Sequence, residues 1–220
     1  MAKFQAVIFD WDGTLADTRQ VLVTAFQQVL RENGCQVEDE FIERRIGIGP
    51  RLIFREALDT CSIPWSPHLL TQLQQRKIQI QITMLDSIQL FEGVVTLLQT
   101  LKDQVKIGLA TMSNRPVIEH TLVKLGVADY FPAIVTFDDV IHSKPNPEVF
   151  LKCATLLDCQ AKHCVVIEDS IFGIMAAKEA HMNCIAVTSG MYSREELEKH
   201  NPDLIVDAIN EYTKILRYII

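Results

Sequence analysis

Two aspartates near the N-terminus stand two positions apart where an apolar run ends. Asp10 and Asp12 follow the run 6–9, and Gly13 directly after them lets the chain turn sharply. Side chains two apart on extended backbone point to the same side, so both carboxylates can face one cleft while Trp11 turns away into packing. Two carboxylates this close repel each other unless a cation or a shared proton intervenes, which favours a hard metal such as magnesium. A lone pair of this kind is also typical of a surface turn.

A second apolar run, residues 107–110, leads into groups that suit an anion. It is followed by Thr111, Met112, Ser113 and Asn114. Hydroxyls together with free backbone N–H groups at the start of a helix form a ready phosphate site. Taken singly, Thr111 or Asn114 is more often an ordinary helix cap, and Pro116 in the first turn supports that alternative for Asn114.

Lys144 lies in a stretch that its neighbours make rigid. Pro145 and Pro147 restrict the backbone after it, and Asn146 and Glu148 suit the start of a helix. A lysine on so stiff a segment is well placed to neutralise a phosphate. The alternative is a solvated side chain, which is the commoner state of lysine.

A further carboxylate pair, Glu168 and Asp169, follows the apolar run 164–167. Ligands of open parallel sheets bind beyond the carboxyl ends of the strands, so these acids are expected near Asp10. Asp169 could complete an oxygen-ligand set for magnesium with Asp10 and the backbone carbonyl of Asp12. The alternative is stabilisation of a helix N-terminus by negative charge, which needs no metal. Four such features in this order favour one shared site.

Six apolar runs define the expected sheet. They span residues 6–9, 107–110, 133–135, 164–167, 184–187 and, more weakly, 204–206. Runs without polar alternation are typical of strands buried on both faces, as in a parallel sheet covered by helices. Helical patterns lie between them, so the repeated unit is a strand followed by a helix. This predicts an α/β fold with a doubly wound, mostly parallel sheet.

Residues 17–85 break this rhythm with amphipathic helical patterns and no strand-like run bounded by turns. Ile78, Ile80 and Ile82 alternate with polar residues as in a strand, but the leucines before them favour a helix, which is our choice. We therefore expect an α/β core of residues 1–16 and 86–220. A small helical domain of residues 17–85 is inserted after its first strand.

Composition limits the classes of partner. The 220 residues are 48% hydrophobic and 22% charged, near the average for globular proteins. The net charge of −7 disfavours nucleic acid and anionic membranes, which bind basic surfaces. No stretch approaches the roughly 20 apolar residues of a membrane span, and residues 1–4 lead into a strand rather than a signal-peptide core. We expect a cytoplasmic protein.

The cysteines also favour a cytoplasmic protein. The chain has six, without a Cys-x-x-Cys pair, and several lie inside apolar runs: Cys35, Cys61, Cys153, Cys159, Cys164 and Cys184. We therefore expect free thiols in a reducing compartment.

Together these motifs resemble those of the haloacid dehalogenase superfamily of phosphotransferases with an aspartate nucleophile. Its four motifs match, in order over essentially the whole chain, Asp10-x-Asp12-Gly-Thr, Thr111, Lys144-Pro and Glu168-Asp169. The resemblance implies a Rossmann-like core in which Asp10 is the nucleophile and Asp12 the general acid and base. It also implies that Thr111 and Lys144 bind phosphate, and that the acid pair holds Mg²⁺ with both aspartates. The helical insert resembles the family's first type of cap, which closes over the substrate.

Two features narrow the resemblance to one branch. Dehalogenases lack the second aspartate, so Asp12 argues against dehalogenation. The residues around Lys144 and Glu168 resemble those of the phosphoglycolate phosphatase and β-phosphoglucomutase branch. The mutase has a cap histidine where this chain has Arg-Gln-Val-Leu at 19–22, and phosphonoacetaldehyde hydrolases use a cap lysine and lack a counterpart of Asp12. The resemblance thus implies hydrolysis of a small phosphate monoester, of the sugar phosphate or phosphoglycolate class.

Two alternative functions stay open. One is a phosphosugar mutase that returns the phosphoryl group to its substrate, with a cap acid or base such as His68 near the site. The other is a phosphate-binding regulator that keeps the fold without turnover. Such a regulator would not need both Asp10 and Asp12.

Further residues are predicted to bind substrate. They are Gly13, Met112, Ser113, Asn114, Arg115 and Arg51. Arg51 could grip a second polar group of the substrate or lie in a surface ion pair. Helix capping is the alternative for Asn114 and solvation the alternative for Arg115. The C-terminal residues 212–220 predict a helix on the sheet edge or a dimer contact, so we expect a monomer or a weak homodimer.

Overall fold

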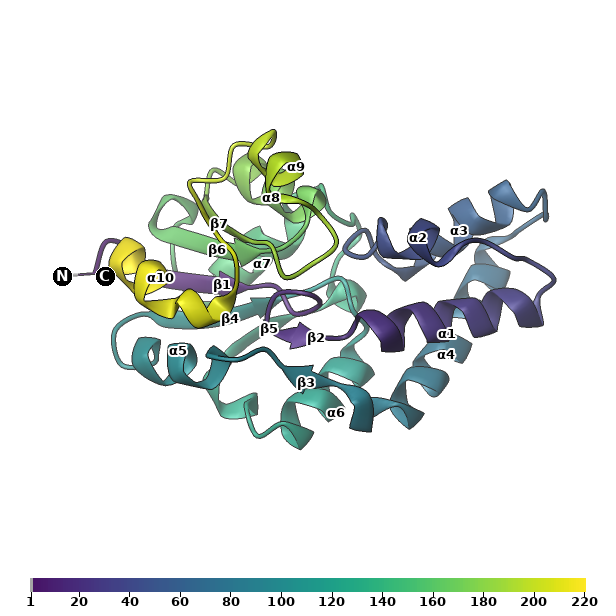
Figure 1. Ribbon diagram of the computed structural model, residues 1–220, viewed down its shortest axis with the longest axis horizontal. Coiled ribbons are helices and arrows are strands. Elements are labelled where there is room, and N and C mark those ends of the chain that lie inside the picture. Colours follow the sequence, from purple (N-terminus) through teal and green to yellow (C-terminus); the bar gives the residue numbers. More distant parts are fainter. Residues whose placement is uncertain (1) are drawn as a thin grey trace.

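Six parallel strands form the centre of the molecule in the computed structural model, which describes residues 2–220 (Figure 1). They lie in the order β5-β4-β1-β6-β7-β8 and all neighbours pair in parallel. Their bounds are Ala6–Phe9 (β1), Lys106–Ala110 (β4), Ala133–Val135 (β5), Cys164–Glu168 (β6), Asn183–Val187 (β7) and Leu204–Val206 (β8). The predicted α/β class and all six predicted strands are confirmed. Met1, the first residue of the predicted core domain, lies outside the described residues.

Helices cover both faces of this sheet, which is why its strands are apolar throughout. On one face lie α5 (Val94–Leu101), α6 (Arg115–Lys124) and α10 (Tyr212–Ile219), packed against the side of β1 that carries Val7 and Phe9. On the other face lie α7 (Glu148–Leu156), α8 (Ile171–Glu179) and α9 (Arg194–Glu198), packed against the side that carries Ala6 and Ile8. Successive residues of one strand therefore enter two separate hydrophobic clusters.

Four helices between β1 and β4 form what we call the helical unit. They are α1 (Arg19–Glu32), α2 (Asp39–Glu43), α3 (Pro50–Thr60) and α4 (Pro67–Thr83). They share a third hydrophobic cluster, in which the rings of Phe26 and Phe54 are 4.9 Å apart. The helix chosen for residues 78–82 is confirmed, because α4 runs through them.

The helical unit is joined to the sheet by two chain segments that lie side by side. They pair as the short antiparallel strands β2 (Ala16–Asp17) and β3 (Gln89–Leu90). Short 3₁₀ turns lie elsewhere, at Leu85–Ser87, Ala128–Tyr130, Phe137–Asp139, Ala161–His163 and Ile209–Glu211. Within residues 2–220, none of the helices combines the length and the apolar character needed to cross a membrane.

The expectation of six free thiols is wrong for two cysteines. Cys35 and Cys61 form a disulfide with a Cα–Cα distance of 5.6 Å, whereas Cys153, Cys159, Cys164 and Cys184 are free. The two partners are 26 positions apart and follow the ends of α1 and α3, which the fold brings together. The spacing of these two cysteines in the sequence does not predict the bond. The disulfide removes part of the argument for a reducing compartment.

We expect this disulfide to stabilise the helical unit. Replacing Cys35 by serine should lower the melting temperature by several degrees, because loss of a native disulfide costs about 2–5 kcal/mol. Cys159→Ser, which changes a free thiol in the core, should leave the melting temperature nearly unchanged. The measurement is thermal unfolding with and without a dithiol reductant. Equal melting temperatures for Cys35→Ser and unreduced wild type, or six reactive thiols in the native protein, would contradict this expectation.

Candidate active site

Lys144 lies at the centre of the predicted site and is fully buried. Its Nζ donates to Asp10 Oδ1 at 2.6 Å, to Glu168 Oε1 at 2.7 Å and to the Ala110 carbonyl at 3.4 Å. Asp10 follows β1, Ala110 ends β4 and Glu168 ends β6. Because these three strands are adjacent and parallel, their carboxyl ends meet at one point of the sheet.

Negative charge exceeds positive charge at this point. Burial alone would lower the pKa of Lys144, but Asp10 and Glu168 raise it above its usual value. Burial and the neighbouring carboxylates raise the pKa of Asp10 and of Asp169, although Lys144 opposes the shift in both. The positive charge of the Lys144 ammonium therefore does not neutralise the negative charge of the acids around it.

The acids fit a hard divalent cation. Asp10, Glu168 and Asp169 each offer a carboxylate oxygen, and these atoms lie within 4.8 Å of one another. Oxygen donors of this kind are what Mg²⁺ prefers. Glu168 already accepts from Lys144 through Oε1 and from the Ser170 N–H and hydroxyl through Oε2, so its oxygens are the most occupied of the set.

Two glycines pack directly against Asp169. A Cβ added to Gly13 would lie 2.4 Å from Asp169 Oδ2, and one added to Gly190 would lie 1.8 Å from the same atom. Gly13 also has φ +78°, a conformation that favours glycine. Thr14 Oγ1 donates to Asp169 Oδ1 at 3.0 Å. Backbone on both sides and one hydroxyl thus hold this carboxylate in place.

Asp12 is held by three hydroxyl groups. Thr18 Oγ1 donates to its Oδ1 at 2.8 Å, and Ser113 Oγ and Thr111 Oγ1 donate to its Oδ2 at 2.5 and 3.4 Å. Trp11 between the two aspartates is buried in the core, as the alternation predicts. Asp10 and Asp12 therefore reach one site from the same strand end.

The residues after β4 surround Asp12 from the other side. Met112 is buried and lines a cavity beside Asp12 together with Ser113. Asn114 is fully buried, and its Nδ2 donates to the carboxylate of Asp138 at 3.2 and 3.3 Å. Its Oδ1 is buried and has no hydrogen-bond partner among the described residues.

Lys77 of α4 is a residue that the sequence analysis missed. It is 1% exposed, lines the same cavity as Asp12, and its Nζ lies 4.9 Å from the centre of the Phe26 ring. Burial lowers its pKa to about 8, against the opposing effect of Asp12 and Asp138. The sequence feature that could have identified Lys77 is its place on the apolar stripe of α4, where Leu70 and Leu73 precede it at helical spacing.

The helical unit closes over Asp12 in this structure. The cavity between Asp12 and Lys77 holds only about 20 Å³, room for roughly one water. Leu22, Phe26 and Ile53 of the helical unit form its remaining apolar wall. A second cavity of about 140 Å³ lies beside Asp169. The cavity between Asp12 and Lys77 is thus too small for a phosphate ester in this arrangement of the helical unit.

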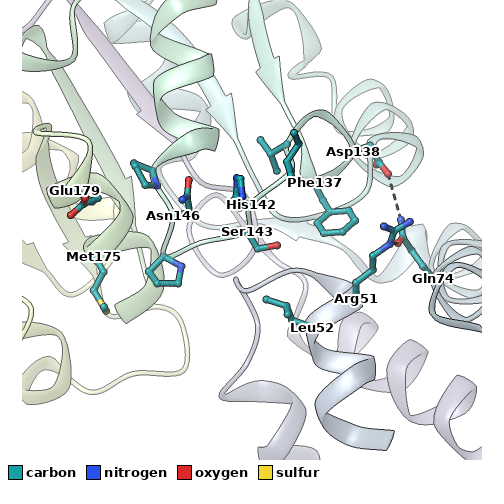
Figure 2. A pocket seen from close by; sticks show the side chains of 14 residues that line it. Arg51, Leu52, Gln74, Phe137, Asp138, His142, Ser143, Asn146, Met175 and Glu179 are labelled. Atoms are coloured by element: carbon teal, nitrogen blue, oxygen red, sulfur yellow. Dashed lines mark hydrogen bonds between the residues drawn. The ribbon is translucent and has the colours of Figure 1, made fainter. Parts of the chain in front are cut away.

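Two of the predicted binding residues lie away from this cavity. Arg51 donates to Gln74 and Thr71 and lines an outer groove of about 1050 Å³, where Figure 2 shows it beside Gln74, which donates in turn to Asp138. Arg115 forms ion pairs with Glu119 and Asp139. Neither arginine lines the cavity beside Asp12. Arg51 contacts two polar side chains of α4 rather than an acid in a surface ion pair, and Arg115 is paired with acids rather than merely solvated.

The comparisons with known proteins place this site in a family. Residues 7–187 match the family model described as haloacid dehalogenase-like hydrolase. A phosphoglycolate phosphatase of Yersinia pseudotuberculosis is 32% identical over 94% of this chain and 91% of its own length. The β-phosphoglucomutase of Bacillus subtilis is 32% identical over 94% of each chain. The crystal structure of a hydrolase from Pseudomonas syringae is 26% identical and superposes with a TM-score of 0.89, over 97% of this chain and 98% of that one.

These matches agree with the geometry. The family model covers both the strand end of Asp10 and the strand end of Glu168, and relatives include both members of the branch that the motifs resemble. The prediction that the chain is an enzyme is confirmed. The chain belongs to the haloacid dehalogenase-like hydrolases.

Proposed function

We propose that the protein is a magnesium-dependent phosphatase that hydrolyses a small phosphate monoester through a phosphorylated Asp10. One observation carries the proposal: Lys144 contacts both Asp10 and Glu168 at hydrogen-bond distance, with Asp12 and Asp169 beside them. A nucleophile, a second carboxylate and a fixed cation in one buried site are the groups that phosphoryl transfer requires.

In the first step, Asp10 attacks phosphorus and the bond from phosphorus to the leaving oxygen breaks. Lys144 holds Asp10 through Oδ1, while no described residue donates to Oδ2. Asp12 gives its proton to the departing oxygen, which leaves as an alcohol. The hydroxyl groups of Thr18 and Ser113 fix the direction in which Asp12 points.

In the second step, Asp12 takes a proton from a water molecule as that water attacks phosphorus. The bond between phosphorus and the Asp10 oxygen breaks and inorganic phosphate leaves. Asp12 is thereby ready to act as an acid again, and Asp10 is restored. Backbone N–H groups in residues 111–114 bind the phosphoryl oxygens during both steps, while the hydroxyls of Thr111 and Ser113 donate to Asp12.

Asp10 and Asp169, with Glu168 behind them and the Asp12 carbonyl as the further predicted ligand, would hold Mg²⁺. The cation supplies charge neutralisation between the carboxylates and the phosphate. The chain's own contribution is to fix Asp169 between Gly13 and Gly190.

We propose that residues 17–85 act as a cap domain over a core of residues 1–16 and 86–220. The cavity beside Asp12 is too small for a substrate, so the cap must open and close in each cycle. The leaving group then lies between Lys77 and the apolar wall of Leu22 and Phe26. A small leaving group with an anionic or strongly polar end, as in phosphoglycolate or a sugar phosphate, fits this pairing.

Hydrolysis is favoured over the mutase reaction. A mutase needs a cap group that exchanges a proton with the sugar hydroxyl. The side chains of α1 that line the cavity beside Asp12 are Leu22 and Phe26, and we assign Lys77 of α4 to holding the substrate as a cation. His68 lies exposed near the start of α4 and does not line this cavity. We also propose that the enzyme works in the cytoplasm, where small phosphorylated metabolites are its partners.

Loss of the nucleophile should abolish turnover. Asp10→Asn keeps the size of the side chain but removes the attacking charge, so phosphate release should fall by at least about a thousandfold. A chelator should have the same effect on wild type, and added Mg²⁺ should reverse it. Phosphate release from a panel of small phosphomonoesters is the measurement. Asp103→Asn, an exposed acid after α5, is the matched control and should retain wild-type rates. Undiminished release by Asp10→Asn would refute the proposal.

Lys77 should make substrate capture depend on pH. Its ammonium is charged below about pH 8 and is lost as the pH rises through about 8, so kcat/KM should decline above that pH. Lys77→Met should remove this alkaline decline and lower kcat/KM roughly a hundredfold, mainly through KM. The neighbouring Arg76 forms only a surface pair with Glu32, so Arg76→Met should keep both the decline and the rate. A Lys77→Met profile that still declines near pH 8 would assign the titration elsewhere.

A further inference from the structure

Arg44, directly after α2, joins the helical unit to the α/β core through several contacts. Its guanidinium donates to both carboxylate oxygens of Glu196 and, at 3.1 Å, to the carbonyl of Met191. It also lies 4.3 Å from the centre of the Tyr192 ring. In return, the Tyr192 hydroxyl donates to the Arg44 carbonyl at 2.5 Å. Side chain and backbone of one residue are therefore both held by the core.

The core side of this contact is built to persist at neutral pH. Hydrogen bonds from Arg44 and from the Ser193 N–H lower the pKa of Glu196 to about 2, so the pair stays ionised. Burial raises the pKa of Tyr192 to about 12, so its hydroxyl stays a donor. Tyr192 is 4% exposed and packs edge-on against Phe172 of α8.

The residues that receive Arg44 belong to the segment 188–193, which connects β7 to α9. The other end of this segment contacts the candidate metal site. Ser189 Oγ donates to the Gly13 carbonyl at 2.7 Å, and the backbone of Gly190 presses on the Asp169 carboxylate. Gly190, against which Asp169 packs, is thus adjacent to Met191 and two positions before Tyr192, both of which contact Arg44.

We propose that Arg44 is a positioning residue that fixes Asp169 and Gly13 when the cap closes, acting through the segment 188–193. Closure of the cap and completion of the metal site become one event, because the same short segment is held at both ends. This inference rests on the proposed function of the site. Arg44, a residue of the cap, would thereby act on the core without contacting the substrate.

Neighbouring residues supply a matched control. Arg45 pairs with Glu56 and stacks on Phe41, and all three lie within the helical unit. Glu196→Gln is a second probe, because glutamine can still accept from the Ser193 N–H and preserve the capping box of α9 while its charge for Arg44 is lost. Gly190→Ala is the positive control, since its Cβ would displace Asp169.

The first measurement is Mg²⁺ binding to the full chain by calorimetry without substrate. Arg44→Ala should raise the Mg²⁺ dissociation constant about tenfold, as loss of outer contacts to a metal ligand does. Arg45→Ala should bind like wild type, and Glu196→Gln should lie between. Combining Arg44→Ala with Glu196→Gln should add nothing to Arg44→Ala alone, because both remove one contact.

The second measurement needs no metal. Hydrogen exchange of the amides in residues 189–192 should accelerate in Arg44→Ala and stay at the wild-type rate in Arg45→Ala. Wild-type Mg²⁺ affinity together with wild-type exchange in Arg44→Ala would overturn the inference and leave the proposed function standing. If wild type binds no Mg²⁺, the metal part of the proposed function fails instead, and unchanged exchange would then also overturn the role of Arg44.

Discussion

The site depends on an imbalance of buried charge. Asp10, Asp12, Glu168 and Asp169 lie at the ends of two neighbouring strands, each no more than 9% exposed, and the ammonium of Lys144 contacts Asp10 and Glu168. Carboxylates that are buried away from water and lie close to one another are costly to keep ionised. A divalent cation would offset that cost, so the arrangement that is costly for the acids alone is the one that fits a hard cation.

The rest of the fold serves to hold these charges where they are. Parallel pairing of β1 with β4 and β6 brings three strand ends together. Glycine at positions 13 and 190 lets two backbone segments approach Asp169 closely. The helical unit lies over Asp12, has its own hydrophobic cluster and is joined to the sheet through the paired segments β2 and β3. In the proposed cap role, closure of this unit would exclude water and thereby strengthen the electrostatic contacts inside.

Much of the fold and of the candidate site was predictable from sequence because it depends on short local patterns of residues. Apolar runs located all six strands, and the residues that follow them include Asp10, Thr111 and Glu168, which the structure brings to one edge. The cap contacts were not predictable in the same way. Lys77 occupies a position on an apolar stripe where lysine is usually solvated, the partners of Arg44 lie about 150 positions away, and Cys35 meets Cys61 only through the packing of two helices. Arg51 was chosen for its type and its loop, but its guanidinium turns to Gln74 on the outer side. Such contacts depend on how helices pack within the helical unit and on how that unit lies against the core, which periodicity does not encode.

The central claim is that Asp10 itself carries the phosphoryl group. The most direct test is to mix the enzyme with Mg²⁺ and a phosphate ester that it hydrolyses, and to quench the reaction in acid within one turnover. Mass spectrometry of the digested chain then locates the phosphorylated residue. The account predicts an acid-stable, base-labile phosphoryl group on the peptide that contains Asp10, at Asp10 itself. Steady turnover with no modified peptide at any quench time, or with the phosphoryl group on another residue, would contradict it.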